Sequence, residues 1–138
     1  MNIPKDDMSS GKKFLIYHVP VILYAGAIIF VSSITTLRTP EVRFLAFDKL
    51  AHFLEYAIFA FLTIRSVSNL SEKLKLEASL LISTVFVILF AVFDEYFVQI
   101  LSKRNSSLYD LTADIIGSML ILILYYILKK RKLKLQKT

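Results

Sequence analysis

Four long apolar stretches occupy most of this sequence, at residues 14–33, 48–65, 77–101 and 110–128. Each has roughly the length of a helix that crosses a bilayer, which needs about 20 residues. Hydrophobic residues make up 56% of the 138-residue chain, which is typical of a polytopic membrane protein. Because a backbone in lipid has to satisfy its own hydrogen bonds, these stretches are predicted to be helices. The sequence therefore predicts an all-α fold, an integral membrane four-helix bundle.

The predicted organisation has three parts: a polar N-terminal tail at residues 1–13, a membrane domain at 14–128 and a basic C-terminal tail at 129–138. The first apolar stretch could also be a signal peptide, since Lys12 and Lys13 precede it. We favour a retained span because the stretch is longer than a typical signal core and ends without a small-x-small cleavage site. The chain has no cysteine, which excludes disulfides, thiolate metal sites and cysteine nucleophiles.

Basic residues are distributed unevenly between the segments that flank the spans. They concentrate in the N-terminal tail, in the connection at 65–75 and in the C-terminal tail, whereas the connections at 35–47 and 102–109 hold fewer. By the positive-inside rule, both termini are predicted to be cytoplasmic in a multi-pass protein of the cytoplasmic membrane. The net charge is +6, but bases directly after the last span favour anionic membrane lipid as a partner over nucleic acid.

Polar and ionisable residues interrupt the apolar stretches, and the predicted orientation puts them near the outer face. A charge at the bilayer centre costs about 2.5 kcal/mol or more on insertion scales, so these groups are expected to face one another. Helical periodicity agrees, because the polar residues of the second and fourth spans fall on one arc of each helix. We predict an outward-facing polar pocket formed by Asp48, Lys49, His52, Glu55, Tyr56, Asp94, Glu95, Gln99, Arg104, Asp110 and Asp114.

Small residues on the fourth span predict where the helices approach one another. Ala113, Gly117 and Ser118 lie on or next to the face that carries Asp110 and Asp114. Small side chains let membrane helices pack closely. The polar face is therefore expected to be the packed face as well.

The predicted pocket holds more acids than bases, so some carboxylates are expected to be protonated or to share a cation. Arg104 is the expected hub, because its planar guanidinium can hold two carboxylates at once. His52, Glu95 and Asp94 are the candidates for proton transfer. The chain has no recognisable nucleophile motif and no glycine-rich phosphate loop, which leaves open whether it is an enzyme. No cofactor is predicted; a divalent cation held by His52 and the acids is an alternative without a tight ligand motif.

Several of these residues also have a purely structural interpretation. Asp48 and Asp110 suit the first turn of a helix, where the helix dipole favours an acid. Lys49 and Tyr56 are typical anchors at the membrane interface, and a single histidine is often structural. The pair Asp94–Glu95 is the hardest to explain in this way, because apolar residues flank it on both sides.

The order and spacing of these residues resemble the VanZ-like family of small bacterial membrane proteins over residues 45–120. The family's Asp-Lys-x-x-His-x-x-x-Tyr element is met by Asp48, Lys49, His52 and Tyr56. Its later elements are met by Asp94, Glu95, Arg104, Asp110 and Gly117. Two positions depart from the pattern: the family's Asn is Asp114 here, and its Gln three residues after the Glu is Val98, with Gln99 one residue later.

The resemblance implies a membrane location and a cell-envelope context, since the family is named for a component of low-level glycopeptide resistance. It does not imply a reaction. One hypothesis is a site for an envelope lipid or lipid-linked precursor, with Lys49 and Arg104 holding phosphate and His52 and Glu95 transferring protons. The alternative is a non-enzymatic accessory protein whose polar network fixes helix packing and recruits a partner. A homo-oligomer is compatible with both.

Reporter fusions test the predicted orientation. A reporter fused after residue 138 is expected to give a cytoplasmic signal, and one inserted in the 35–47 connection an extracytoplasmic signal, because bases are retained on the cytoplasmic side. An extracytoplasmic signal from the C-terminal fusion would reverse every side assignment made above.

Overall fold

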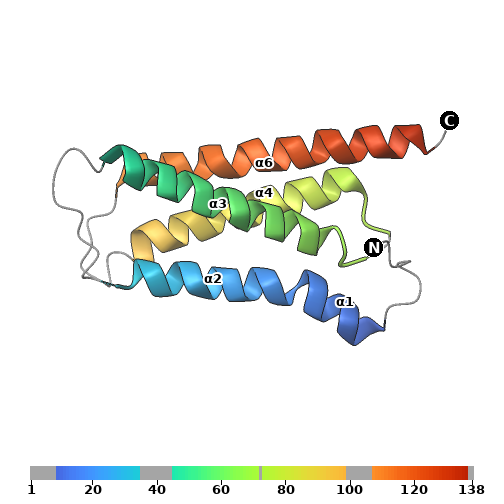
Figure 1. The fold of residues 1–138 in the computed structure, drawn as a ribbon, viewed down its shortest axis with the longest axis horizontal. Coiled ribbons are helices and arrows are strands. Elements are labelled where there is room, and N and C mark those ends of the chain that lie inside the picture. Colours follow the sequence, from blue (N-terminus) through green and yellow to red (C-terminus); the bar gives the residue numbers. More distant parts are fainter. Residues whose placement is uncertain (1–8, 35–44, 72, 99–106, 137–138) are drawn as a thin grey trace.

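The computed structural model describes residues 9–34, 45–71, 73–98 and 107–136. Within them the chain forms helices and no strand, in the order α1 (Ser10–Tyr17), α2 (Val19–Ser32), α3 (Leu45–Val67), α4 (Leu76–Phe93), the π-helical turn η2 (Asp94–Val98) and α6 (Leu108–Leu135). They supply four segments long and apolar enough to cross a membrane, at Ser10–Ser32, Phe47–Val67, Leu76–Val98 and Leu108–Leu135. The prediction of an all-α membrane bundle with four helices is confirmed (Figure 1).

The first membrane span is one helix in two pieces. Helices α1 and α2 are separated at His18, and Pro20 lies in the first turn of α2. Proline has no N–H and crowds the preceding turn, which explains a break at this place. Backbone bonds nevertheless bridge the break, from His18 N–H to the Phe14 carbonyl at 2.9 Å and from Ile22 N–H to the His18 carbonyl at 3.2 Å. The first span is therefore bent at His18 but continues as one helical segment (Figure 1).

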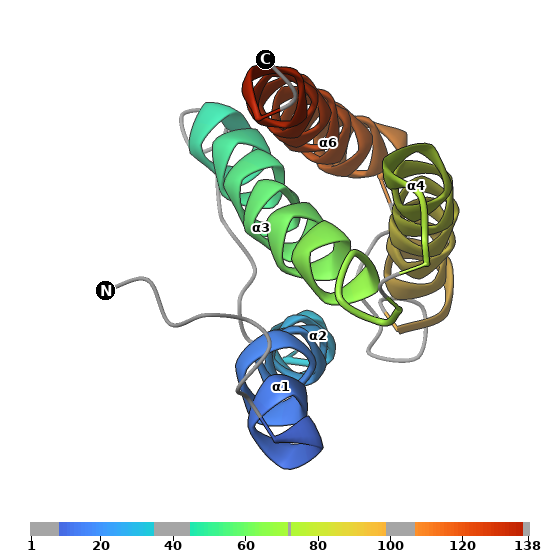
Figure 2. The same cartoon turned by 90° about the vertical axis from the view of Figure 1, so that its right-hand side faces the viewer.

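Helix α3 is the centre of the bundle. It lies between α6 and α2, with α4 beside it, and packs most extensively against α6 (Figure 2). In the membrane-length part of α3, 44% of the residues are buried, against 6% in the first span. The first span is therefore a peripheral helix, and α3 is the one that the others cover.

Aromatic rings fill the interior next to α3. Phe59 is completely buried, and its ring centroid lies 4.6 Å from that of Phe90 and 5.9 Å from that of Tyr56. Large apolar side chains such as Leu81 and Leu89 stand exposed on the outside of α4. Lipid tails are as apolar as leucine, so such an exterior suits a helix surrounded by acyl chains. The remaining residues of the core are Ile28, Ala60, Ile64, Val87, Ala91 and Leu122.

The close contact between α3 and α6 depends on Gly117. This residue is buried, and a Cβ atom added to it would collide with the backbone carbonyl of Phe53. Next to it, the completely buried Ser118 donates a hydrogen bond to the carbonyl of Asp114 at 2.7 Å, and its hydroxyl lies 3.4 Å from the carbonyl of Tyr56. Ala113 is half-buried nearby on the same helix. Gly117 and Ser118 thus lie against the backbone of α3.

Helix α6 is longer than the sequence predicts. Its last turns run through Lys129 and Arg131 to Leu135, a region predicted to be a separate basic tail. Lysine, arginine and leucine are all good helix formers, and no proline or glycine follows Gly117, so nothing ends the helix at the end of the apolar stretch. The predicted end of the third span, residues 99–101, lies outside the described residues.

Replacing Gly117 by alanine is expected to destabilise the bundle, because the added methyl group would force the α3 and α6 backbones apart. Overpacking of this kind costs about 1–3 kcal/mol. Gly26→Ala is the matched control, since nothing lies within 4 Å of a Cβ atom at that position. Thermal unfolding in detergent should show a lower midpoint for Gly117→Ala only; equal midpoints for both variants would contradict this packing.

Candidate functional site

The helices bring their polar residues together at one end of the bundle. The end of α2, the start of α3, the turn η2 at the end of α4 and the start of α6 all lie at the left in Figure 1. We call this group of side chains the polar site; it consists of Ser32, Asp48, Lys49, His52, Tyr56, Asp94, Glu95, Asp110 and Asp114. Of the other residues predicted for the pocket, Glu55 is half-buried on α3, and Gln99 and Arg104 lie outside the described residues.

Lys49 links the starts of α3 and α6 at the rim of the polar site. Its ammonium group lies 3.0 Å from a carboxylate oxygen of Asp48 and also pairs with the carboxylate of Asp110. The side chains of Lys49 and Asp48 are 30% and 25% exposed, whereas that of Asp110 is 11% exposed. One base therefore joins two acids from different helices, at a depth that solvent still reaches.

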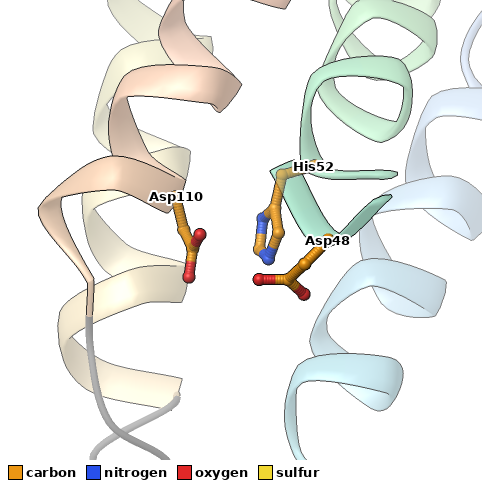
Figure 3. Close-up of side chains that lie close together, drawn as sticks. All are labelled: Asp48, His52 and Asp110. Carbon is orange, nitrogen blue, oxygen red and sulfur yellow. The ribbon is translucent and has the colours of Figure 1, made fainter. Parts of the chain in front are cut away.

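His52 forms the deeper connection between the same two helices. Its Nδ1 atom lies 3.1 Å from an oxygen of Asp114, whose side chain is 1% exposed. Figure 3 shows the His52 ring directed into the space between the carboxylates of Asp48 and Asp110. A carboxylate at Nδ1 favours the tautomer with its proton there. The other ring nitrogen is then the atom that can accept a proton from a bound group.

Asp94 is held by hydroxyl groups rather than by a base among the residues described. The hydroxyl of Ser32 donates to its Oδ2 atom at 2.9 Å, and the hydroxyl of Tyr56 lies 3.4 Å from the same oxygen. Both Asp94 and Tyr56 are almost completely buried. Ser32 thereby joins the first span to the polar site, and sequence reasoning missed it. The sequence does place a serine at the predicted outer end of that span, at the same depth as the acids, and this could have indicated the contact.

Glu95 stabilises the beginning of α6. Its carboxylate accepts a hydrogen bond from the backbone N–H of Ser107, the residue that precedes this helix. The first N–H groups of a helix have no partner within it, and the helix dipole favours an anion there. This contact gives Glu95, which is 1% exposed, a structural role that the sequence did not indicate.

The turn η2 explains how two consecutive acids can both be buried. In an α-helix, adjacent side chains point about 100° apart, so only one of them would face the interior directly. A π-helical turn closes its hydrogen bonds over five residues instead of four and so reduces this angle. Asp94 and Glu95 open this turn and are both buried. Such turns frequently occur at functional sites.

Three side chains of the polar site are spaced as metal ligands. Asp48, His52 and Asp110 each offer a ligand atom, and these atoms all lie within 4.8 Å of one another (Figure 3). Carboxylate and imidazole groups suit several divalent metals. The ammonium group of Lys49 lies against both of these acids, however, so a cation would have to displace it. A metal ion and the Lys49 ammonium group would therefore compete for the same two carboxylates.

The fold and the site together define a polytopic membrane protein that gathers acids, a lysine and a histidine at one end of a four-helix bundle. The chain belongs to the VanZ/LLP1 family, whose model matches residues 8–129. The VanZ-like resemblance is therefore confirmed, and the match includes every residue of the polar site. No curated protein and no solved structure matches the chain.

The contact between His52 and Asp114 is expected to show energetic coupling. His52→Gln and Asp114→Asn each remove the same contact, so the double variant should be less destabilised than the sum of the single variants. For residues in direct contact this coupling is typically about 0.5–3 kcal/mol. Equilibrium unfolding in mixed micelles measures it.

The matched control pairs His52→Gln with Thr112→Val. The Thr112 side chain is exposed, and its hydroxyl donates to the Leu108 carbonyl of its own helix at 2.6 Å, its one hydrogen bond among the described residues. That pair should be additive. Additivity in the His52/Asp114 cycle as well would mean that the contact contributes nothing to stability.

Proposed function

We propose that the polar site binds the headgroup of a cell-envelope lipid or lipid-linked precursor at the outer face of the membrane. The burial of Asp94, Asp110 and Asp114 together at one end of membrane-length helices is the observation that supports this most. Acids in such a place are costly and usually have a partner or a task. A headgroup lies at the membrane surface, within reach of the half-exposed rim formed by Asp48 and Lys49.

The charge of the polar site favours one part of such a ligand. Its described residues carry five carboxylates, on Asp48, Asp94, Glu95, Asp110 and Asp114, and two basic groups, on Lys49 and His52. Lys49 is engaged with two acids, so a phosphate group would compete with them for the ammonium. Carboxylates accept hydrogen bonds, and accept the strongest ones from charged donors. The site therefore suits the hydroxyl or ammonium groups of a headgroup better than its phosphate.

Among the three candidates for proton transfer, His52 is the best placed. Asp94 and Glu95 are buried and already accept hydrogen bonds from Ser32 and from the Ser107 backbone. His52 is 9% exposed, its ring lies between the carboxylates of Asp48 and Asp110 next to the rim (Figure 3), and Asp114 fixes its orientation. A histidine oriented by a carboxylate is a common arrangement for moving a proton near neutral pH. Asp114 would then be a positioning residue for His52.

The alternative function is that of an accessory protein in which the same network fixes the helices and the surface recruits a partner. The observation in its favour is that the contacts of the polar site join one helix to another: Lys49 to Asp110 and His52 to Asp114 across α3 and α6, and Ser32 to Asp94 across α2 and η2. A network of this kind specifies a unique arrangement without any ligand.

Ligand binding separates the two functions. Asp48→Asn is the informative variant, because Asp48 stands at the exposed rim and can be altered without opening the core. Binding of a labelled polyprenyl-diphosphate-linked disaccharide to the protein in nanodiscs should weaken about tenfold, the loss expected for one charge-assisted hydrogen bond. Glu77→Gln, the same change at an exposed position of the opposite end, is the control and should bind as the wild type does.

Two results would contradict the lipid-binding function. One is the absence of binding by the wild type at lipid concentrations that saturate known lipid-binding proteins. The other is a lower unfolding midpoint for Asp48→Asn without any change in affinity. The second result would favour the accessory function, because the rim would then serve only to hold α3 against α6.

A further inference from the structure

A second polar cavity lies at the end of the bundle opposite the polar site. It is a pocket of about 330 Å³ between α1, the residues that follow α3, the start of α4 and the end of α6. Two lysines line it, Lys13 and Lys129, together with hydroxyl and amide groups such as those of Tyr17 and Asn69. No acid is among the described residues of its wall. The charge of these two lysines complements an anion.

These two lysines differ from their neighbours in how far they are covered. Lys13 and Lys129 are half-buried in the pocket, whereas the adjacent Lys12 and Lys130 are exposed. The guanidinium of Arg65 adds a further positive charge nearby, 5.1 Å from the ring centre of Tyr17. At this end of the bundle, half-buried as well as exposed basic side chains therefore contribute positive charge.

An apolar groove of about 530 Å³ lies nearer the middle of the bundle. It exists because the first span packs loosely: Gly26 is exposed there, and a Cβ atom added to it would have nothing within 4 Å. Ala25 and Gly26 form one wall, Val67 belongs to α3, and Phe86 belongs to α4. The groove runs along membrane-length helices, so the molecules around it are acyl chains.

The pocket and the groove follow one another along the same helix faces. On the first span, Lys13 and Tyr17 line the pocket, and Val21 and Ala25 line the groove, at a spacing of four residues throughout. On α4, Ser79 lines the pocket and Phe86 lines the groove, seven residues later on the same face. A ligand that filled both would have a charged end and an apolar end.

A buried hydroxyl group in the groove indicates a third contact. Thr63 lines the groove and is 2% exposed, and its hydroxyl has no hydrogen-bond partner among the described residues. A buried polar group without a partner is unfavourable. A glycerolipid carries ester carbonyls between its phosphate and its chains, and such a carbonyl can accept a hydrogen bond from this hydroxyl.

From these observations we propose that this chain binds one anionic phospholipid, with the phosphate between Lys13 and Lys129 and an acyl chain in the groove between α2, α3 and α4. Inorganic phosphate would match the lysines but not the groove. A zwitterionic lipid would match the groove but gain less from the lysines. This site is at the other end of the bundle from the polar site and does not rest on the function proposed for it.

Native mass spectrometry of the purified full chain, with phosphatidylglycerol and phosphatidylcholine added at equal concentration, tests the proposal. The wild type should retain one phosphatidylglycerol in preference to phosphatidylcholine. Lys13→Gln with Lys129→Gln should lower phosphatidylglycerol retention about tenfold or more, since each lysine near an anionic headgroup contributes about fivefold. The charge-matched control, Lys12→Gln with Lys130→Gln, should stay within about twofold of the wild type.

Two further variants test the groove. Gly26→Leu should lower the retention of both lipids, because its side chain would fill the groove, whereas Ala27→Leu, at an exposed neighbouring position that does not line it, should not. Thr63→Val keeps the size of the side chain and should reduce retention severalfold. Unfolding midpoints measured alongside establish that each variant is folded.

Three results would overturn the proposal. The first is an equal loss of phosphatidylglycerol in the control lysine pair, which would mean that only the general surface charge attracts lipid. The second is wild-type retention by folded Gly26→Leu and Thr63→Val, which would exclude a chain in the groove. The third is complete displacement of the lipid by millimolar inorganic phosphate, which would mean that the headgroup pocket acts alone.

Discussion

Charged groups buried at one end of a membrane bundle are stable only where they face one another, and the contact between α3 and α6 depends on this constraint. Lys49 with Asp110 and His52 with Asp114 join these two helices at two depths. Removing one partner of such a contact leaves the other polar group without compensation, which is unfavourable where water is scarce. The collision that any side chain at Gly117 would make with the Phe53 carbonyl marks how closely the backbones then approach. Polar pairing and close packing are therefore parts of the same interface.

The remaining helices are attached to this pair by weaker contacts. The turn η2 brings Asp94 and Glu95 inward, where Asp94 accepts a hydrogen bond from Ser32 of the first span and Glu95 one from the start of α6. Away from that end the first span has few buried residues, and an apolar groove separates part of it from its neighbours. A bundle that is tight at one end and open toward lipid along one helix can hold polar headgroups and acyl chains in different places.

Much of this protein could be predicted from residue patterns. Four apolar stretches of membrane length predicted the helices, and the acids among them predicted that the polar faces would meet. The spacing of Asp48, Lys49, His52 and Tyr56 was sufficient to indicate the VanZ-like family. Two contacts were not predictable in the same way. Nothing in the sequence distinguishes Ser32 from other serines at the end of a span. Its hydrogen bond to Asp94 depends on how the first span packs against η2. The contact of Glu95 with the Ser107 backbone likewise depends on where α6 begins.

Residue patterns alone were enough to predict a helical membrane protein. A backbone without water has to form its hydrogen bonds within each segment, and about twenty apolar residues suffice to cross a bilayer. The same patterns also determined which residues could form a polar site, because ionisable side chains in apolar surroundings must find partners. The pairing of the acids came from the three-dimensional packing. Among the described residues, Lys49 pairs with Asp48 and Asp110, His52 with Asp114, hydroxyl groups with Asp94, and the Ser107 backbone with Glu95. Pairing depends on how the helices are rotated and shifted against one another, and this is set by packing at residues such as Gly117 and by the widened turn at η2.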